Sequence, residues 1–208
     1  YCFYKGTSFA NSCFSLKLHI SFNNFKLRHI CVFSIKKLMN FKKNLVLLGM
    51  MASGKSTIGK LVSRKLGLKF YDIDKLIEDE MRMTISEIFN NKSEIFFRSL
   101  EEKITLRILE NKNSVISLGG GSFFNDKIQK EILNNHVSFW LNCSNNLLIK
   151  RIRKNNKRPI ANKLNNKELV NLISSRKKIY KRAKFKINCD KLSKQQITTN
   201  IINLYETI

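Results

Sequence analysis

One short segment of this 208-residue chain has the residue types and spacing of a phosphate-binding loop. It reads Gly49-Met-Met-Ala-Ser-Gly54-Lys55-Ser56 and fits the pattern G-x-x-x-x-G-K-[ST]. The backbone N–H groups of such a loop, and of the helix that follows it, surround phosphate oxygens. Lys55 would place its charge against the β- and γ-phosphates, and the Ser56 hydroxyl would ligate Mg²⁺. The segment predicts a site for a nucleoside triphosphate, with these nucleotide contacts: Met51, Ala52, Ser53, Gly54, Lys55, Ser56 and Thr57.

Two carboxylates follow the second strand that the sequence predicts, in Tyr71-Asp72-Ile-Asp74. The third predicted strand supplies none, because it leads directly into Gly119. In an extended stretch, side chains two residues apart point the same way. We therefore expect Asp72 to serve the metal through water and Asp74 to meet a substrate hydroxyl. The plainer alternative is that one of them only caps the helix that follows.

Three consecutive glycines, Gly119-Gly-Gly121, follow a predicted buried strand. In that position they suggest backbone amides that approach a small ligand closely. Arg98 lies on a predicted helix that would cover the substrate side, with Glu101 and Glu102 after it. Taken alone, an arginine in this position would normally be a solvated charge that pairs with one of these acids.

The segment Lys150–Lys186 is rich in lysine and arginine, and Glu168 is its only acid. It could be a solvated helix face, an RNA-binding patch, or a mobile lid that closes positive charge over a nucleotide. Few aromatic residues interrupt the basic ones, which disfavours base stacking.

Strand and helix alternate from Asn44 onward, so the elements that must position these residues form an α/β fold. Apolar runs predict strands at 44–48, 70–71, 114–118, 136–141 and 185–188. Helical periodicity predicts helices at 55–66, through Ile77 and Met81, from Thr84, and at 91–110, 125–134, 145–154, 166–182 and 192–206. The phosphate-binding pattern then lies between a strand and a helix, as it requires.

Composition narrows the class of protein further. Hydrophobic residues make up 43% of the chain, enough for a sizeable core, and no apolar run approaches the roughly 18 residues of a membrane span. The net charge of +24 would suit nucleic acid. However, a sequence rich in Lys, Asn, Ile and Phe is also what AT-rich coding produces, so we expect neither a nucleic-acid nor a membrane partner. The five scattered cysteines form no C-x-x-C pair, which argues against a zinc site or a disulfide framework and for a reducing compartment.

The first 38 residues differ from the rest, because they contain no Asp or Glu. They resemble either a basic transit peptide or upstream sequence read through in frame before Met39. We favour the second interpretation, which gives an extension at 1–38, a catalytic domain at 39–208 and a cytoplasmic location. A genuine transit peptide would indicate a plastid instead.

Residues 44 to about 205 resemble shikimate kinase in the order and spacing of several motifs. The matching pieces are Gly49–Thr57, Phe70–Asp74, Phe97-Arg98 with Glu101-Glu102, Gly119–Gly121, Arg158-Pro159, and Arg176 followed by Tyr180. Many nucleotide-binding proteins share the first piece, whereas the combination of the others is far more specific.

The resemblance implies a nucleoside-monophosphate-kinase-like fold of three layers, αβα. Its five-stranded parallel sheet would have the order 2-3-1-4-5, with a mobile lid at roughly 153–165. It also implies a monomer that transfers the γ-phosphate of ATP, with Mg²⁺, to the 3-hydroxyl of shikimate on the route to chorismate and the aromatic amino acids.

The resemblance also implies a role for each matching residue. The shikimate-binding positions are Asp74, Arg98, Gly119, Gly120, Gly121 and Arg176. Lys55, Asp74 and Arg158 would be catalytic, with Arg158 reaching the phosphates from the lid and Arg151 flanking the adenine. Ser56 and Asp72 would hold the metal.

The chain departs from the family pattern at Met50-Met51-Ala52, at Ile160 and at Lys178, and none of these changes removes a catalytic group. Two alternatives remain at this point. A kinase of another small molecule, resembling gluconate kinase, would use similar groups, and a basic RNA-binding NTPase would use the same phosphate-binding loop.

Overall fold

The computed structural model describes residues 43–154 and 164–208. The expected extension at 1–38, most of the expected lid, and Arg158 therefore lie outside the described residues.

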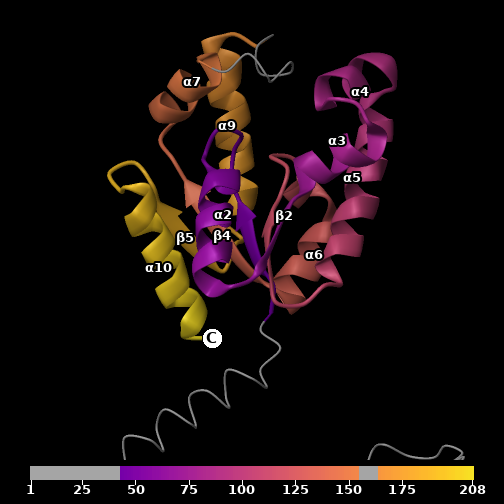
Figure 1. Ribbon diagram of the computed structural model, residues 1–208. Coiled ribbons are helices and arrows are strands. Elements are labelled where there is room, and N and C mark those ends of the chain that lie inside the picture. The colour runs from indigo at the N-terminus through magenta and orange to yellow at the C-terminus, as the bar shows by residue number, and fades with distance from the viewer. Residues whose placement is uncertain (1–42, 155–163) are drawn as a thin grey trace, which may run out of the picture. The chain divides into compact units, whose positions relative to one another are not determined.

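Five parallel strands form the centre of the described region. They are β1 (Leu45–Leu48), β2 (Lys69–Asp72), β3 (Ser114–Ser117), β4 (Val137–Asn142) and β5 (Phe185–Asn188). Their order in the sheet is β2-β3-β1-β4-β5, which confirms the predicted topology (Figure 1). The central strand β1 is almost wholly buried, as expected for an apolar strand covered on both faces.

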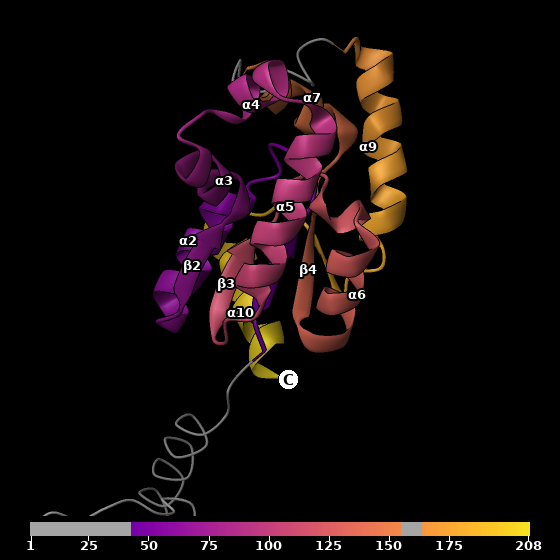
Figure 2. The same ribbon diagram turned by 90° about the vertical axis from the view of Figure 1, so that its right-hand side faces the viewer.

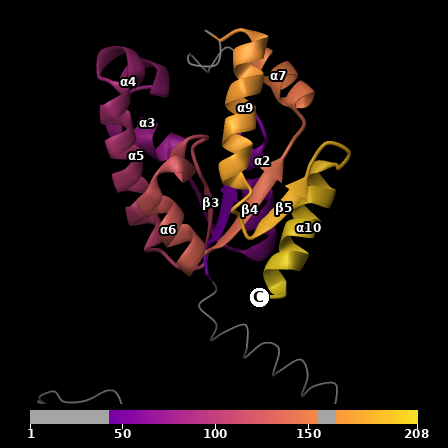
Figure 3. The same cartoon turned by 180° about the vertical axis from the view of Figure 1, so that it is seen from behind.

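Helices cover both faces of the sheet. They are α2 (Lys55–Leu66), α3 (Ile73–Met81), α4 (Ile85–Asn91), α5 (Glu94–Leu109), α6 (Asp126–Asn135), α7 (Asn145–Arg153), α9 (Asn166–Tyr180) and α10 (Lys194–Glu206). The short 3₁₀ helix η1 (Ser122–Phe124) follows the glycine triplet. Figure 1 shows α2 beside α10 on one face, and Figure 3 shows α5, α6 and α9 on the other. Helix α5 lies between α3 and α6 (Figure 2). None of the helices in the described ranges is long and apolar enough to span a membrane.

Side-chain caps decide where two of the helices begin. At α4, the Thr84 hydroxyl accepts a hydrogen bond from the Glu87 N–H at 3.3 Å, and the Glu87 carboxylate accepts one from the Thr84 N–H at 2.7 Å. This capping box confirms the predicted start. The helix predicted from Asn91 was wrong at its start, because α4 ends there and α5 begins three residues later. Ser93 separates the two helices, since its hydroxyl accepts a hydrogen bond from the Phe96 N–H at 3.1 Å.

A buried amide, that of Asn44, joins the chain at the start of β1 to the neighbouring elements. The Asn44 side chain is 1% exposed. Its Nδ2 donates to the carbonyls of Leu109, at 3.0 Å, and Asn111, and its Oδ1 accepts from the Ser114 N–H at 3.1 Å. Asn44 thus ties the end of α5 to the start of β3.

We predict that Asn44→Ala lowers the free energy of unfolding by about 2–4 kcal/mol, because it leaves several buried backbone groups without a partner. Urea denaturation measures this loss. Asn135→Ala is the matched control, since the Asn135 amide makes one exposed hydrogen bond to Glu131, and its effect should stay within about 0.5 kcal/mol. Equal effects of the two changes would contradict the role given to Asn44.

Candidate active site

The phosphate-binding loop connects β1 to α2 and has the backbone that an anion site requires. Gly49 has φ 145°, and a Cβ there would lie 2.9 Å from the Leu141 carbonyl oxygen, so a side chain does not fit. Gly54, at the N-cap of α2, has φ 98°. The described first turn of α2 contains neither an acidic residue nor a side-chain cap. The amino end of α2 therefore directs its N–H groups and its dipole toward the place where phosphate would bind.

Two cations lie at this loop. The buried Lys55 ammonium donates to the carbonyls of Gly49, at 2.9 Å, and Met50, at 3.1 Å. From α7, the Arg151 Nη1 donates to the Ala52 carbonyl at 3.2 Å. Ser56 and Thr57 are exposed on the first turn of α2. The loop thus combines inward-facing amides with positive charge, as a triphosphate site needs.

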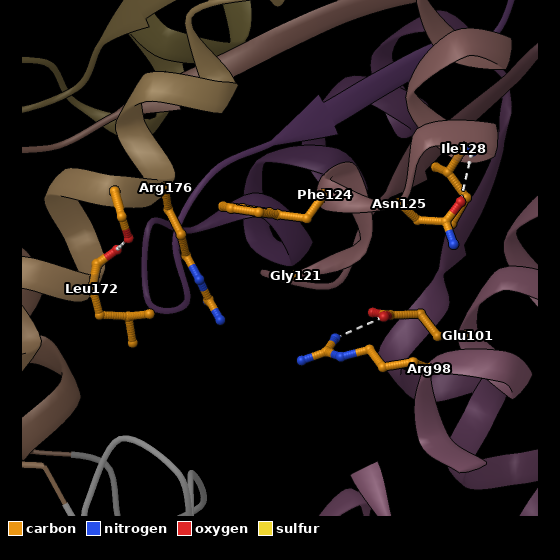
Figure 4. Close-up of a pocket in the computed structure, with 9 residues that line it drawn as sticks. Arg98, Glu101, Gly121, Phe124, Asn125, Ile128, Leu172 and Arg176 are labelled. Carbon is orange, nitrogen blue, oxygen red and sulfur yellow. Dashed lines mark hydrogen bonds and ion pairs between the residues drawn. The ribbon is translucent and has the colours of Figure 1, made fainter. Parts of the chain in front are cut away.

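A cavity of about 440 Å³, a size suited to a small ligand, lies between α5 and α9. Its lining residues are Arg98, Glu101, Gly121, Phe124, Asn125, Ile128, Leu172, Ser175 and Arg176. In Figure 4, Arg98 extends into the cavity from α5 and Arg176 extends into it from α9. The two guanidinium groups face one another across this space.

Carboxylates hold Arg98 in place. Its Nη1 lies 2.7 Å from Oε2 of Glu101, and its Nη2 lies 3.2 Å from Oε1 of Glu94. Glu101 is only 3% exposed, and it also accepts a hydrogen bond from the Ser122 hydroxyl at 2.6 Å. Burial lowers the pKa of Arg98, but the two carboxylates outweigh it and raise that pKa. The pairing expected for a solvated Arg98 does occur, yet it aims the guanidinium into the cavity.

Arg176 is placed differently. Its Nη1 lies 3.6 Å from the Met50 sulfur, and its guanidinium lies 5.9 Å from the centre of the Phe124 ring. Among the described residues, no carboxylate lies within ion-pair distance of it. Burial and the nearby charge of Arg98 lower its pKa. A bound anion would relieve both effects, so the cavity favours a ligand with a carboxylate or phosphate group.

The first glycine of the triplet brings Asp74 to this site. A Cβ on Gly119 would lie 2.8 Å from Oδ1 of Asp74, 2.8 Å from the Ser122 hydroxyl, and closer still to Oε1 of Glu101. A side chain at Gly119 would have to displace these groups. The Asp74 carboxylate thus faces the same loop as Glu101, which holds Arg98.

The other two glycines connect the cavity to the phosphate-binding loop. A Cβ on Gly120 would lie 3.2 Å from Nη1 of Arg176 and 3.4 Å from the Met51 backbone nitrogen. A Cβ on Gly121 would lie 2.6 Å from Nη1 of Arg98. The triplet therefore lies against both guanidinium groups and one amide of the phosphate-binding loop.

Comparison with known proteins shows the family of the chain. The model of the shikimate kinase family matches residues 51–206. Shikimate kinase of Bartonella quintana is 38% identical over 179 residues, covering 84% of this chain and 85% of the relative. That of Persephonella marina is 39% identical over 160 residues, covering 77% and 97%. The chain belongs to the shikimate kinase family. The resemblance seen in the sequence is thereby confirmed.

Solved shikimate kinases share the fold. The Bacteroides thetaiotaomicron structure has a TM-score of 0.69 at 31% identity, covering 79% of this chain and 97% of that one. The Acinetobacter baumannii structure, a complex with shikimate, has a TM-score of 0.77 at 24% identity, covering 82% and 97%.

One geometric argument from the sequence was wrong. It placed both members of the Asp72 and Asp74 pair in extended chain, but β2 ends at Asp72 and α3 begins at Ile73, so Asp74 lies in the first turn of a helix. The two carboxylates consequently do not share a strand face. The capping alternative also fails for Asp72, which occupies the N-cap of α3 without a side-chain cap hydrogen bond.

The sequence did not single out every residue of this shikimate kinase site. Phe124, Asn125, Ile128, Leu172 and Ser175 line the cavity, and no pattern distinguishes them from ordinary helix residues. Glu101 was foreseen as a partner of Arg98 and as part of a matching family motif, but no role in the site was given to it. Its spacing of three residues from Arg98 was the available signal, and its burial appears only in three dimensions.

Ala52 is strained at one of the positions where the chain departs from the family pattern. Its φ is 63°, in the left-handed region that favours glycine. The chain therefore holds an alanine in a glycine-like conformation at the phosphate-binding loop.

We predict that Ala52→Gly changes the free energy of unfolding by less than about 1 kcal/mol. Relief of the left-handed strain, about 1 kcal/mol, is offset by the greater freedom of glycine in the unfolded chain. Ala52→Val should lower stability by about 1–3 kcal/mol, because β-branched residues tolerate positive φ poorly. Urea denaturation compares the two variants. Equal stability of the Gly and Val variants would rule out backbone strain at this position.

Proposed function

We propose that this protein transfers the γ-phosphate of ATP to the 3-hydroxyl of shikimate, with Mg²⁺, and releases ADP and shikimate 3-phosphate. The proposal rests on Gly120, which lies between Arg176 of the cavity and the phosphate-binding loop. Nη1 of Arg176 lies within 3.2 Å of its Cβ position, and the Met51 nitrogen lies within 3.4 Å. A cavity for an anionic ligand thus adjoins a loop for phosphate, and family membership indicates which hydroxylated acid occupies it.

Shikimate would bind through complementary groups. The guanidinium groups of Arg98 and Arg176 would hold its carboxylate, since guanidinium matches carboxylate in a two-pronged geometry. The Gly119–Gly121 loop and Asp74 would hold its ring hydroxyls. Glu101 would keep Arg98 from turning toward solvent, because the two are joined at 2.7 Å.

ATP would bind at the other side of Gly120. The amides of Met51–Thr57 would surround its phosphates, and Lys55 would leave the carbonyls that it now contacts to bind the β- and γ-phosphates. Arg151, placed by its bond to the Ala52 carbonyl, would flank the adenine. Arg158, which lies outside the described residues, would contact the phosphates.

The described residues fit a magnesium ion whose ligands come mainly from the nucleotide and water. No group of three or more His, Cys, Asp or Glu side chains in the described ranges could hold a metal by itself, and Mg²⁺ in kinases takes few protein ligands. Ser56 lies at the start of α2. Asp72 pairs in register with Ser117 on β3, which pairs with Leu47 on β1. Two strand spacings, about 10 Å, separate Asp72 from β1, so Asp72 would act through water. When bound, the ion would neutralise charge on the β- and γ-phosphate oxygens.

The residues of the chain would then position and polarise the reactants. The Asp74 carboxylate accepts a hydrogen bond from the 3-hydroxyl and takes its proton as the new O–P bond forms. The bond from the γ-phosphorus to the bridging oxygen breaks, and ADP keeps that electron pair. Lys55 and Arg158 stabilise the charge on the transferring group. The walls of the acid-binding cavity between α5 and α9 keep the acceptor oriented.

The alternatives are less well supported. The relatives described above are shikimate kinases, which favours shikimate over a sugar acid such as gluconate. We also propose that the protein works as a monomer without nucleic acid, with a catalytic domain at 39–208 preceded by an extension.

We predict that the full chain releases ADP from MgATP when shikimate is added. A coupled assay of ADP formation measures this, and chelation of Mg²⁺ should abolish it. Gluconate and a polynucleotide serve as comparison substrates. Turnover with gluconate equal to that with shikimate, or ATP hydrolysis that depends on polynucleotide, would overturn the assignment.

We predict that Asp74→Asn lowers kcat about 10²–10⁴-fold, the usual contribution of a general base, and leaves the ATP dissociation constant within about twofold. Asp79→Asn is the matched control, because Asp79 is on the same helix, exposed, and paired only with Lys75 at 2.9 Å in the described structure. It should leave kcat unchanged. Loss of ATP affinity in the Asp74 variant would contradict the division of roles.

A further inference from the structure

Tyr180 is a buried tyrosine that no step of the proposed reaction uses. It is the last residue of α9, and its side chain is only 1% exposed. Its ring centre lies 6.2 Å from that of Trp140 and 6.3 Å from that of Phe124. A tyrosine hydroxyl in such apolar surroundings needs a hydrogen-bond partner. The Tyr180 hydroxyl finds one sixty residues away, where it donates to the Gly120 carbonyl.

A guanidinium lies at the same glycine. Arg176 precedes Tyr180 by four residues on α9, so the two side chains lie on one face of the helix. They meet at Gly120, since a Cβ there would lie 3.2 Å from Nη1 of Arg176 and the Tyr180 hydroxyl donates to the Gly120 carbonyl. Because the hydroxyl gives its single hydrogen to Gly120, it can meet the Arg176 guanidinium only as an acceptor. Burial raises the pKa of Tyr180 to about 12, so the donor stays protonated at neutral pH.

The contact with Gly120 also fixes the direction of the next amide. A peptide unit is planar and trans, so the Gly120 carbonyl and the Gly121 N–H point in opposite directions. With the carbonyl held by Tyr180, the N–H is directed away from that side chain. In the described part of the chain, the Gly121 N–H donates to no acceptor within the protein. Gly121 itself lines the cavity, so this donor is available to a ligand there.

We propose that Tyr180 is a positioning residue for the acceptor substrate. Its hydroxyl fixes the Gly120 carbonyl beside the Arg176 guanidinium on the same helix, and so holds a backbone donor and a cation at a fixed spacing around the acid. The inference rests on the proposed function, since it takes the acceptor to be shikimate. It predicts that loss of the hydroxyl weakens the acceptor site and spares the nucleotide site.

The test is Tyr180→Phe, which removes the hydroxyl and keeps the ring. We expect the KM for shikimate to rise about tenfold, while the KM for ATP stays within twofold and kcat changes less than the shikimate KM. The single tryptophan of the chain is Trp140, so its fluorescence offers an independent titration of shikimate binding.

Tyr205→Phe is the matched control. The Tyr205 side chain is 2% exposed, and its hydroxyl donates to the Lys43 carbonyl at 2.6 Å. Tyr205→Phe therefore removes a buried tyrosine hydroxyl, from α10, that donates to a backbone carbonyl as the Tyr180 hydroxyl does. The loss of stability should be similar. The KM for shikimate should not change.

The outcomes separate the two proposals. If the wild-type chain does not phosphorylate shikimate, the proposed function fails and this inference fails with it. If the wild type is active and Tyr180→Phe leaves the KM for shikimate unchanged, or raises both KM values equally, only the positioning role is overturned. If Tyr180→Phe does not fold, 3,5-difluorotyrosine at position 180 replaces it, since fluorination lowers the pKa of the hydroxyl. The KM for shikimate should then rise at a lower pH than in the wild type, and superimposed pH profiles would overturn the proposal.

Discussion

The absence of side chains at three consecutive positions is the constraint on which the site depends. A Cβ on Gly119 would collide with the carboxylates of Asp74 and Glu101, and a Cβ on Gly121 would collide with the Arg98 guanidinium. The backbone between β3 and η1 can therefore approach charged groups from α3, α5 and α9 at once. Each of these groups needs hydrogen-bond partners when it is buried, and the short distances allow backbone and side chains to provide them.

The topology of the sheet explains why those helices meet. In a parallel sheet, each strand ends at the same edge, and the loops that follow lie together there. The phosphate-binding loop follows β1, Asp72 ends β2, and the glycine triplet follows β3. Because β3 lies between β2 and β1, its glycines lie between the carboxylates and the phosphate-binding loop. The strand order therefore places the site for the phosphate acceptor and the site for ATP along the same edge of the sheet.

Much of the fold followed from local patterns. Helix α2 and strand β5 have the predicted bounds, and the strand order agrees with the family resemblance. Errors arose where one side chain overrides periodicity, as when the Ser93 cap starts α5. They also arose where extended chain was assumed across a strand end, as at Asp74.

The site was predictable to a different degree. Residues that belong to sequence motifs, such as Lys55, Arg98 and Arg176, were identified from the sequence. The structure brings both arginines to one cavity. The contribution of Glu101 and Tyr180 depends on their burial and on contacts between residues far apart in the chain. Sequence periodicity does not reveal either. The role of Arg158 stays a prediction, because the residue lies outside the described ranges.

Asn44 lies at the start of β1, whereas the chemistry takes place where the same strand ends. The hydrogen bonds of this amide go to Leu109, Asn111 and Ser114, none of which lines the acceptor cavity. The two ends of a single four-residue strand can thus change separately during evolution. Adaptation to a hotter or colder environment can proceed at one end of β1 while substrate choice is preserved at the other.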